Sequence, residues 1–177
     1  TRALDDVSIN FTNGKVNALV GKNGSGKSTL VKIFAGAVKP TAGDIYLGDQ
    51  KLQFNSTSDA NEKGIASVYQ EMSLIPGLTV AENIYLGRLP MKFGRIDWRK
   101  SYQMADELLQ KMNVKINPRQ IISRLSMWQM QVVEITKALS FNPKVIMLDE
   151  PTSALAQNEV QNLFSALRAL RDRGVVV

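Results

Sequence analysis

The chain has 177 residues, of which 44% are hydrophobic and 21% charged, as is usual for one globular domain with a sizeable core. The absence of cysteine excludes disulfides and thiolate metal sites, and the absence of histidine means that any mechanism needing one must take it from elsewhere. The net charge is +6, but the basic residues are spread along the chain, which disfavours a nucleic-acid partner, and no apolar run is long enough to predict a membrane helix.

The first seventy residues alternate between predicted strands and predicted helices. Two runs of partly alternating apolar residues flank the pair Asn13-Gly14, which is a strong hairpin signal. A helix after the second run should end near Gly36, with Pro40 just beyond it. In chain order we expect strands over 4–11 and 16–20, a helix over 28–37, a strand over 44–47, a short helix over 56–63 and a strand over 65–69.

The pattern is helical over residues 71–140, and then the strand pattern returns. Thr79 and Glu82 form a capping-box pattern, and Ser126 is a suitable N-cap. Alternation of strands and helices implies an α/β domain with a mostly parallel sheet, into which the helical segment is inserted. In chain order we expect helices over 79–86, 97–112 and 127–139, a buried strand over 144–148, a helix over 158–173 and the beginning of a strand over 175–177.

Residues 21–29 fit the phosphate-loop pattern G-x-x-x-x-G-K-[ST]. Glycines let backbone N–H groups turn toward phosphate oxygens, and the following helix adds the positive end of its dipole. Lys27 would contact the β and γ phosphates, and Ser28 would offer its hydroxyl to Mg²⁺. A chance glycine-rich turn would not also lie between a strand and a helix. The predicted ATP-binding residues are Gly21, Asn23, Gly24, Ser25, Gly26, Lys27, Ser28 and Thr29.

Two acids, Asp149 and Glu150, follow the apolar strand over 144–148. Asp149 would hold Mg²⁺, through water, and Glu150 would orient or deprotonate the water that attacks the phosphate. A strand that ends in two solvated acids is the plain alternative. The phosphate loop earlier in the chain favours the functional interpretation.

Together these motifs resemble the ABC ATPase family, and the resemblance covers essentially the whole chain. Gln70 lies where that family has its Q-loop glutamine, and the segment Leu125-Ser126-Met127-Trp128-Gln129 lies where the family has its signature. The acids continue into Ser153, Ala154, Leu155 and Ala156, the position of the D-loop. The resemblance implies a P-loop NTPase fold, with a mostly parallel core, an N-terminal antiparallel β portion and an inserted helical subdomain. It also implies a catalytic set of Lys27, Gln70 and Glu150, and a Mg²⁺ site at Ser28, Gln70 and Asp149.

The segments 70–74, 78–84, 86–88 and 96–98 are similar to the sugar importers, in which one polypeptide carries two ATPase domains. The chain is most similar to the N-terminal one. The resemblance implies ATP-powered import of a ribose-, galactose- or xylose-type sugar, at the cytoplasmic face of the membrane. The implied partners are a second ATPase domain, integral membrane permease subunits and a periplasmic or lipid-anchored sugar-binding protein, with no nucleic acid. A nucleoside importer, a soluble ABC ATPase that acts on nucleic acid or the ribosome, and a non-hydrolysing scaffold are the alternatives.

The chain departs from the family at two motifs. Met127 and Trp128 stand where the signature usually has glycines, and Ala156 stands where the D-loop often has Asp. Glycine would let the backbone approach the γ-phosphate of the partner domain, which bulky Trp128 hinders. We therefore expect an asymmetric pair of sites. The alternative is that Trp128 is a buried or interface aromatic.

We expect residues 1–177 to form a single nucleotide-binding domain. Its core would span 1–70 and 141–177, and its helical subdomain 71–140. The family's adenine-stacking aromatic would precede Thr1, and its switch histidine would follow the strand that begins at Val175. From this resemblance we expect a domain truncated at both ends, with little ATPase activity of its own.

Overall fold

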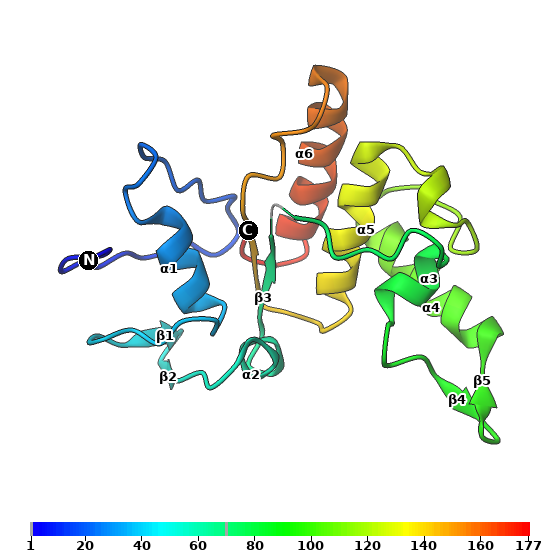
Figure 1. Ribbon diagram of the computed structural model, residues 1–177, viewed down its shortest axis with the longest axis horizontal. Coiled ribbons are helices and arrows are strands. Elements are labelled where there is room, and N and C mark those ends of the chain that lie inside the picture. Colours follow the sequence, from blue (N-terminus) through cyan, green and yellow to red (C-terminus); the bar gives the residue numbers. More distant parts are fainter. Residues whose placement is uncertain (1, 70) are drawn as a thin grey trace.

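The computed structural model describes residues 2–69 and 71–177 and arranges them in two groups with β3 between them (Figure 1). The N-terminal group contains α1 (Lys27–Phe34), β1 (Ile45–Leu47), β2 (Gln50–Leu52) and α2 (Thr57–Glu62). β3 (Ile65–Val68) follows, and the second group contains α3 (Val80–Ile84), β4 (Met91–Lys92), β5 (Arg95–Ile96), α4 (Trp98–Lys111), a 3-10 turn (Ile122–Arg124), α5 (Met127–Leu139), β6 (Val145–Leu148) and α6 (Gln157–Arg171). None of the helices in the described ranges is long and apolar enough to cross a bilayer.

The parallel pair β3–β6 connects the two groups. Its register runs from Ile65 opposite Val145 to Val68 opposite Leu148, so both strands end at the same edge. Val176 forms a parallel bridge to Val145 on the other side of β6, as expected for a strand that begins at 175. The α/β class with a parallel core is therefore confirmed, and the antiparallel portion is the pair β1–β2.

The larger core surrounds α5. Eight of its thirteen residues are buried, which makes it the central helix, with α3, α4, α6 and β3 packed against it. The largest wholly buried side chains of this core include Ile84, Leu109, Ile135, Ile146 and Leu167. The smaller core, formed by Leu52, Phe54, Ala60 and Ile65, lies under the N-terminal group.

The C-terminal end of α1 is set by a glycine. Gly36 has a φ of +71°, and the amide of Ala37 donates to the carbonyl of Lys32 while the amide of Gly36 donates to that of Ile33. This is the Schellman arrangement. A Cβ at Gly36 would lie 2.5 Å from the carbonyl oxygen of Ser56, so the glycine also permits close packing of α1 on the segment before α2. The helix therefore ends earlier than the expected residue 37.

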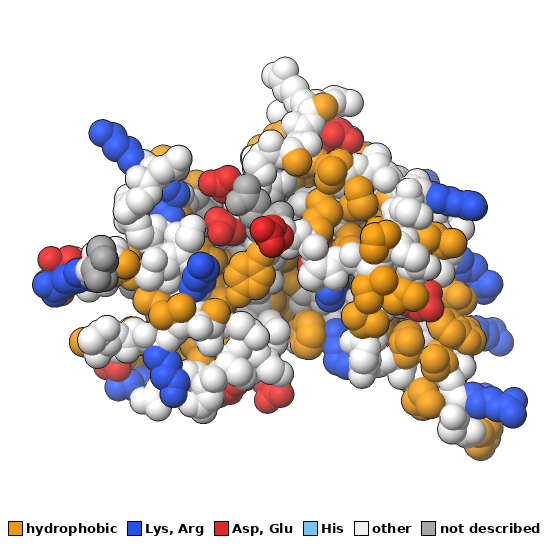
Figure 2. Space-filling view, viewed as in Figure 1, with side chains coloured by type: hydrophobic (Ala, Val, Ile, Leu, Met, Phe, Trp, Pro, Cys, Tyr) orange, Lys and Arg blue, Asp and Glu red, His pale blue; other side chains and the backbone are white. Residues whose placement is uncertain are grey.

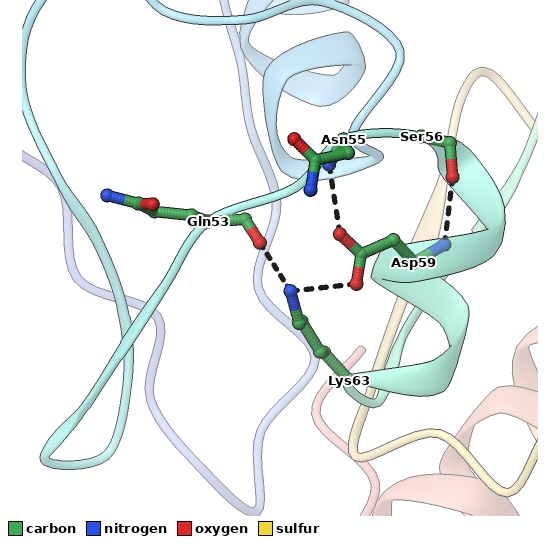
Figure 3. A network of polar contacts seen from close by, with 5 residues as sticks. All are labelled: Gln53, Asn55, Ser56, Asp59 and Lys63. Atoms are coloured by element: carbon green, nitrogen blue, oxygen red, sulfur yellow. Dashed lines mark hydrogen bonds and ion pairs between the residues drawn. The ribbon is translucent and has the colours of Figure 1, made fainter.

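A polar network fixes the start of α2 (Figure 3). The amide of Asp59 donates to the hydroxyl of Ser56, and the Asp59 carboxylate accepts from the amide of Asn55 and pairs with Lys63 at 2.7 Å. Lys63 also donates to the carbonyl of Gln53 at 2.6 Å. These contacts hold the chain between β2 and α2, and the expected short helix over 56–63 is confirmed.

The strands expected over 4–11 and 16–20 are not formed. The turn at Asn13-Gly14 is present, but the side chain of Asn17 takes the place of a strand partner, since it accepts from the amide of Thr12 and donates to the Thr12 carbonyl. A side-chain amide that satisfies the backbone competes in this way with a ladder. The amide of Asn17 donates to the carbonyl of Val177 at 2.7 Å, one contact where a strand needs several.

The remaining expected elements are close to those observed. α5 has the predicted bounds, and α3 begins at the predicted capping box, where Thr79 and Glu82 exchange hydrogen bonds. α4, α6 and β6 lie within one or two residues of the predicted ranges. The strands β2, β4 and β5 were not expected from the sequence.

Candidate functional site

The loop over residues 21–26 is shaped by its glycines. Gly24 and Gly26 have φ values of +81° and +89°, in the left-handed region that side chains disfavour. A Cβ at Gly26 would lie 2.6 Å from the carbonyl oxygen of Ala3, and a Cβ at Gly21 would lie 2.6 Å from the Oγ of Ser25. A side chain is therefore excluded by conformation at Gly24 and also by space at Gly26.

Lys27, the first residue of α1, folds back over this loop. Its Nζ atom donates to the carbonyl oxygens of Gly21 at 2.7 Å and Lys22 at 2.9 Å. Both contacts are at the surface, where carbonyl oxygens can return to water at small cost. The ammonium group is thus held at the loop by partners that a stronger anionic ligand could replace.

The N-terminal end of α1 opens onto the same loop. Gly26 is its N-cap and has no side chain to accept from the first amides, so those of Lys27, Ser28 and Thr29 remain available to a ligand or to water. Together with the helix dipole they favour an anion here. Ser28 is exposed and Thr29 half-buried.

The two acids lie where β3 and β6 end together. The amide of Asp149 donates to the carbonyl of Val68 at 3.0 Å, which extends the parallel pairing by one residue. Asp149 is half-buried and Glu150 is exposed. Glu150 has a φ of +47°, and its carbonyl accepts from both the amide and the hydroxyl of Ser153. The backbone thus turns sharply where the second carboxylate is presented.

The structure brings some of the predicted residues together and leaves others apart. Asp149 and Glu150 share the edge at which β3 ends, and the predicted Gln70 lies outside the described residues. The phosphate loop belongs to the N-terminal group, and the Asn17–Val177 contact joins that group to the segment that bridges to β6 through Val176. Within the described ranges no cluster of three or more His, Cys, Asp or Glu side chains could hold a metal ion.

The predicted signature residues lie at the start of α5 in the second group. The amide of Ser126 donates to Oε1 of Gln129 at 3.0 Å, and Leu125 is buried. Met127 is exposed, whereas Trp128 is half-buried and packs against the larger core. No hydrogen bond among the described residues joins this segment to the phosphate loop. In the predicted D-loop, the hydroxyl of Ser153 donates to the carbonyl of Glu150 and holds the turn there. Ala154 is exposed and Leu155 is half-buried. The amide of Ala156 donates to Glu159 at the start of α6.

One polar cluster was missed by the sequence analysis. The hydroxyl of Ser73 donates to Oε1 of Glu134, a buried residue of α5, and Lys137 donates to the same hydroxyl. This cluster holds the segment after residue 70 against α5. The signal in the sequence is an acid within the otherwise apolar run of α5.

A family model described as ABC transporter matches residues 4–153. The chain is 46% identical to the "Arabinose import ATP-binding protein AraG" of Vibrio parahaemolyticus, with 99% of this chain and 35% of that protein covered. It is 44% identical to the "Ribose import ATP-binding protein RbsA 1" of Streptomyces avermitilis, covering 98% and 33%. It is 43% identical to the "Galactose/methyl galactoside import ATP-binding protein MglA" of Clostridium tetani, covering 99% and 36%. The chain thus spans about a third of the length of these curated relatives.

Solved structures give the same fold. The ADP conformation of MJ1267, an ATP-binding cassette of an ABC transporter, matches with a TM-score of 0.84 at 29% identity, covering 98% of this chain and 72% of that one. A dimeric post-hydrolysis state of the cassette MJ0796, bound to ADP and Pi, matches with a TM-score of 0.76 at 30% identity, covering 98% and 77%. The described residues therefore have the α/β fold of these cassettes.

Proposed function

This chain belongs to the ABC transporter family, and on that premise we propose that it binds ATP with Mg²⁺ and hydrolyses ATP to power the import of a sugar. The observation that carries the proposal is the position of Lys27. Its Nζ atom lies 2.7 Å and 2.9 Å from two carbonyl oxygens of a loop in which only glycine fits at Gly26. The names of the relatives support the sugar as cargo.

The loop would receive the phosphates through its backbone. The amides at the start of α1 have no side-chain cap and would donate to phosphate oxygens, while Lys27 would exchange its two carbonyl partners for β- and γ-phosphate oxygens. Charge-assisted hydrogen bonds to phosphate are stronger than those to neutral carbonyls, so the exchange is favourable. The remaining residues of this site would be Gly21, Asn23, Gly24, Ser25, Ser28 and Thr29.

The edge of β3 and β6 would supply the hydrolytic groups. Ser28 and Asp149 suit a Mg²⁺ ion that is also held by phosphates and water, with Gln70 as a further ligand. When bound, that ion would offset negative charge on the phosphates. Exposed Glu150 would orient the attacking water and accept its proton.

The test compares ATP binding and hydrolysis in the full-length protein with its permease. Lys27→Ala should abolish the stabilisation by ATP and Mg²⁺, which amounts to about 2.7 kcal/mol at a hundredfold excess over Kd. Glu150→Gln should keep that stabilisation and lower turnover by about a hundredfold or more. Lys15→Ala, which removes an exposed lysine from the turn before the loop, is the matched control. Stabilisation retained in Lys27→Ala, or normal turnover in Glu150→Gln, contradicts the proposal.

The sugar is tested separately by uptake. Cells that lack the protein should recover uptake of labelled arabinose, ribose or galactose when the wild type is returned, but not when Glu150→Gln is returned. If only nucleoside uptake recovers, the cargo is a nucleoside and not a sugar.

The proposed partners are permease subunits, a sugar-binding protein and a second ATPase domain. Residues 71–140 would pass motion to the permease from a core of 1–70 and 141–177. The proposed location is peripheral, on the cytoplasmic face of the membrane.

We propose in addition that the two sites of the ATPase pair are unequal. Trp128 would stand where the backbone must approach the partner's γ-phosphate, so the site that it completes would be the slower one. Trp128→Gly in the full-length protein should raise turnover at the partner's site. Unchanged turnover at that site would contradict the proposed asymmetry.

A further inference from the structure

A small hairpin projects from the second group, at the end away from the β3–β6 pair (Figure 1). Its strands β4 and β5 pair Met91 with Ile96 and Lys92 with Arg95, and Phe93 and Gly94 form the two-residue turn. The proposed nucleotide site uses none of these residues. Their arrangement therefore needs its own explanation.

The hairpin is amphipathic. Residues that pair directly across two strands share one face, and the neighbouring pair lies on the other face. Met91 and Ile96 thus form an apolar face, while Lys92 and Arg95 form a basic face, and all four are exposed. The Lys92 ammonium lies 5.8 Å from the centre of the Phe93 ring, so the basic face extends to the aromatic tip.

The residue at the tip is unusual for its turn. Phe93 and Gly94 have φ values of +50° and +76°, as in the type I′ turn, where the usual pair is Asn-Gly. Phe93 is 94% exposed and Met91 61% exposed, so both side chains gain little packing within the chain. A strained residue that contributes little to its own fold motivates a role toward another molecule.

The hairpin is firmly braced at its base. The amide of Asp97 donates to the carbonyl of Pro90 at 2.8 Å, and the Asp97 carboxylate caps α4 by accepting from the amide of Lys100. The rings of Trp98 and Tyr102 stack with centres 5.9 Å apart. Because the support is already ordered, binding at the tip loses little conformational entropy.

Positive charge gathers around this apolar tip. Residues 91–100 contain four basic side chains and one acidic side chain, in a chain whose net charge is +6. The acid, Asp97, is the helix cap, and the exposed cations are Lys92, Arg95, Arg99 and Lys100. Figure 2 shows hydrophobic and basic side chains side by side at this end of the molecule. Because the hairpin projects from the molecule and is surrounded by positive charge, it suits a partner that is flat, deformable and negatively charged.

We propose that the β4–β5 hairpin inserts its tip into the surface of an anionic lipid bilayer. Phe93 and Met91 would enter the boundary between headgroups and acyl chains, where aromatic side chains are favoured. The four cations would lie among the lipid phosphates, to which each is attracted. This goes beyond the proposed function, because it involves no nucleotide. A polyanion without acyl chains would leave the face of Met91 and Ile96 in water.

The experiment is vesicle flotation of the full-length protein without nucleotide. Vesicles of phosphatidylcholine alone are compared with vesicles in which about a third of the lipid is phosphatidylglycerol. The wild type should float with the anionic vesicles and less so at high salt. Glu150→Gln should float equally well, which separates this test from that of ATP hydrolysis.

Phe93→Asn is the main variant, because asparagine suits the left-handed position and preserves the turn. It should weaken vesicle binding about tenfold. Lys92→Gln and Arg95→Gln should each weaken binding to anionic vesicles about fivefold. The controls are Tyr46→Asn, which removes an exposed aromatic from β1, and Lys115→Gln, which removes an exposed cation outside the hairpin. Both should bind like the wild type. In Phe93→Trp, brominated lipid should quench a larger share of the tryptophan emission than in the wild type, whose own tryptophans are Trp98 and Trp128.

Three results would overturn the proposal. The first is equal binding to neutral and anionic vesicles, and the second is unchanged binding by Phe93→Asn. The third is an absence of vesicle binding while the hairpin variants weaken pull-down of a permease, of a second copy of the chain or of single-stranded RNA. The occupant of the hairpin would then be that macromolecule.

Discussion

The hydroxyl of Ser73 donates a 2.6 Å hydrogen bond to the buried carboxylate of Glu134, and it accepts one of 2.7 Å from the ammonium of Lys137. The second carboxylate oxygen of Glu134 is buried and has no hydrogen-bond partner within the described residues. A carboxylate that has lost its hydration depends on the few partners it keeps. The Ser73–Glu134 hydrogen bond therefore does two things. It holds the segment after residue 70 to α5, and it partly satisfies the buried carboxylate of that helix.

Ser73→Ala should destabilise the fold by about 1–3 kcal/mol, because it leaves Glu134 with only the long contact from the amide of residue 73. The measurement is urea unfolding, in which the midpoint should fall at an unchanged slope. Ser123→Ala is the control, since its exposed hydroxyl makes no hydrogen bond among the described residues. Equal midpoints for the two variants would show that the Ser73 contact contributes nothing.

Gly26→Ala and Gly24→Ala separate conformation from crowding in the phosphate loop. Both glycines have strongly positive φ, so each substitution should cost about 1–2 kcal/mol of stability. At Gly24 the added methyl group meets nothing within 4 Å, whereas at Gly26 it meets the Ala3 carbonyl at 2.6 Å. Gly26→Ala should therefore be the more damaging by thermal unfolding. If Gly24→Ala costs as much, the contact with Ala3 is not the reason.

Local signals in the sequence were sufficient for some elements. The run Val145–Leu148 is apolar throughout, and the start of α5 carries its own capping pair in Ser126 and Gln129, so both elements could be located from the sequence. The strands over 4–11 and 16–20 could not be judged in this way, because a strand forms only with a partner. Here Asn17 satisfies Thr12 through its side chain. The β4–β5 hairpin escaped notice because its turn is Phe-Gly.

The candidate site likewise contains some features that could be located from the sequence and others that could not. The loop over 21–29 is a contiguous motif, so its residues could be located from the sequence, and the role proposed for Lys27 rests on that motif. The meeting of Asp149 with the end of β3 depends on a parallel pairing between residues about eighty positions apart. The Ser73–Glu134 contact likewise depends on tertiary packing, and a single acid in a helix does not reveal its partner.

The Asp59–Lys63 pair predicts a pH dependence (Figure 3). The hydrogen bond from Lys63, followed by that from the amide of Asn55, holds the pKa of the Asp59 carboxyl below its ordinary value of 3.8. A lowered pKa in the folded state stabilises the fold above the ordinary value, and that stabilisation is lost as the pH falls through the folded value. The difference in stability between the wild type and Asp59→Asn should thus be constant near neutral pH and shrink below pH 3.8. A difference that persists in strong acid would contradict this.

Glu150→Gly should make the protein more stable and inactive. Glu150 has a φ of +47°, which costs a residue with a Cβ about 1–2 kcal/mol, and glycine avoids this cost. The turn itself should survive, since Ser153 bonds to the backbone carbonyl of residue 150. We expect a gain of about 1 kcal/mol in thermal unfolding, because the greater freedom of glycine in the unfolded chain offsets part of the relief.

Glu150→Gln is the matched control for this change. It removes the carboxylate but keeps the Cβ, so it should lose ATP hydrolysis to the same extent with little change in stability. The two variants together separate the chemical role of the carboxylate from the strain of the position that presents it. If Glu150→Gly is no more stable than Glu150→Gln, the left-handed backbone at this residue is not strained. If both variants hydrolyse ATP at the wild-type rate, another group must activate the water.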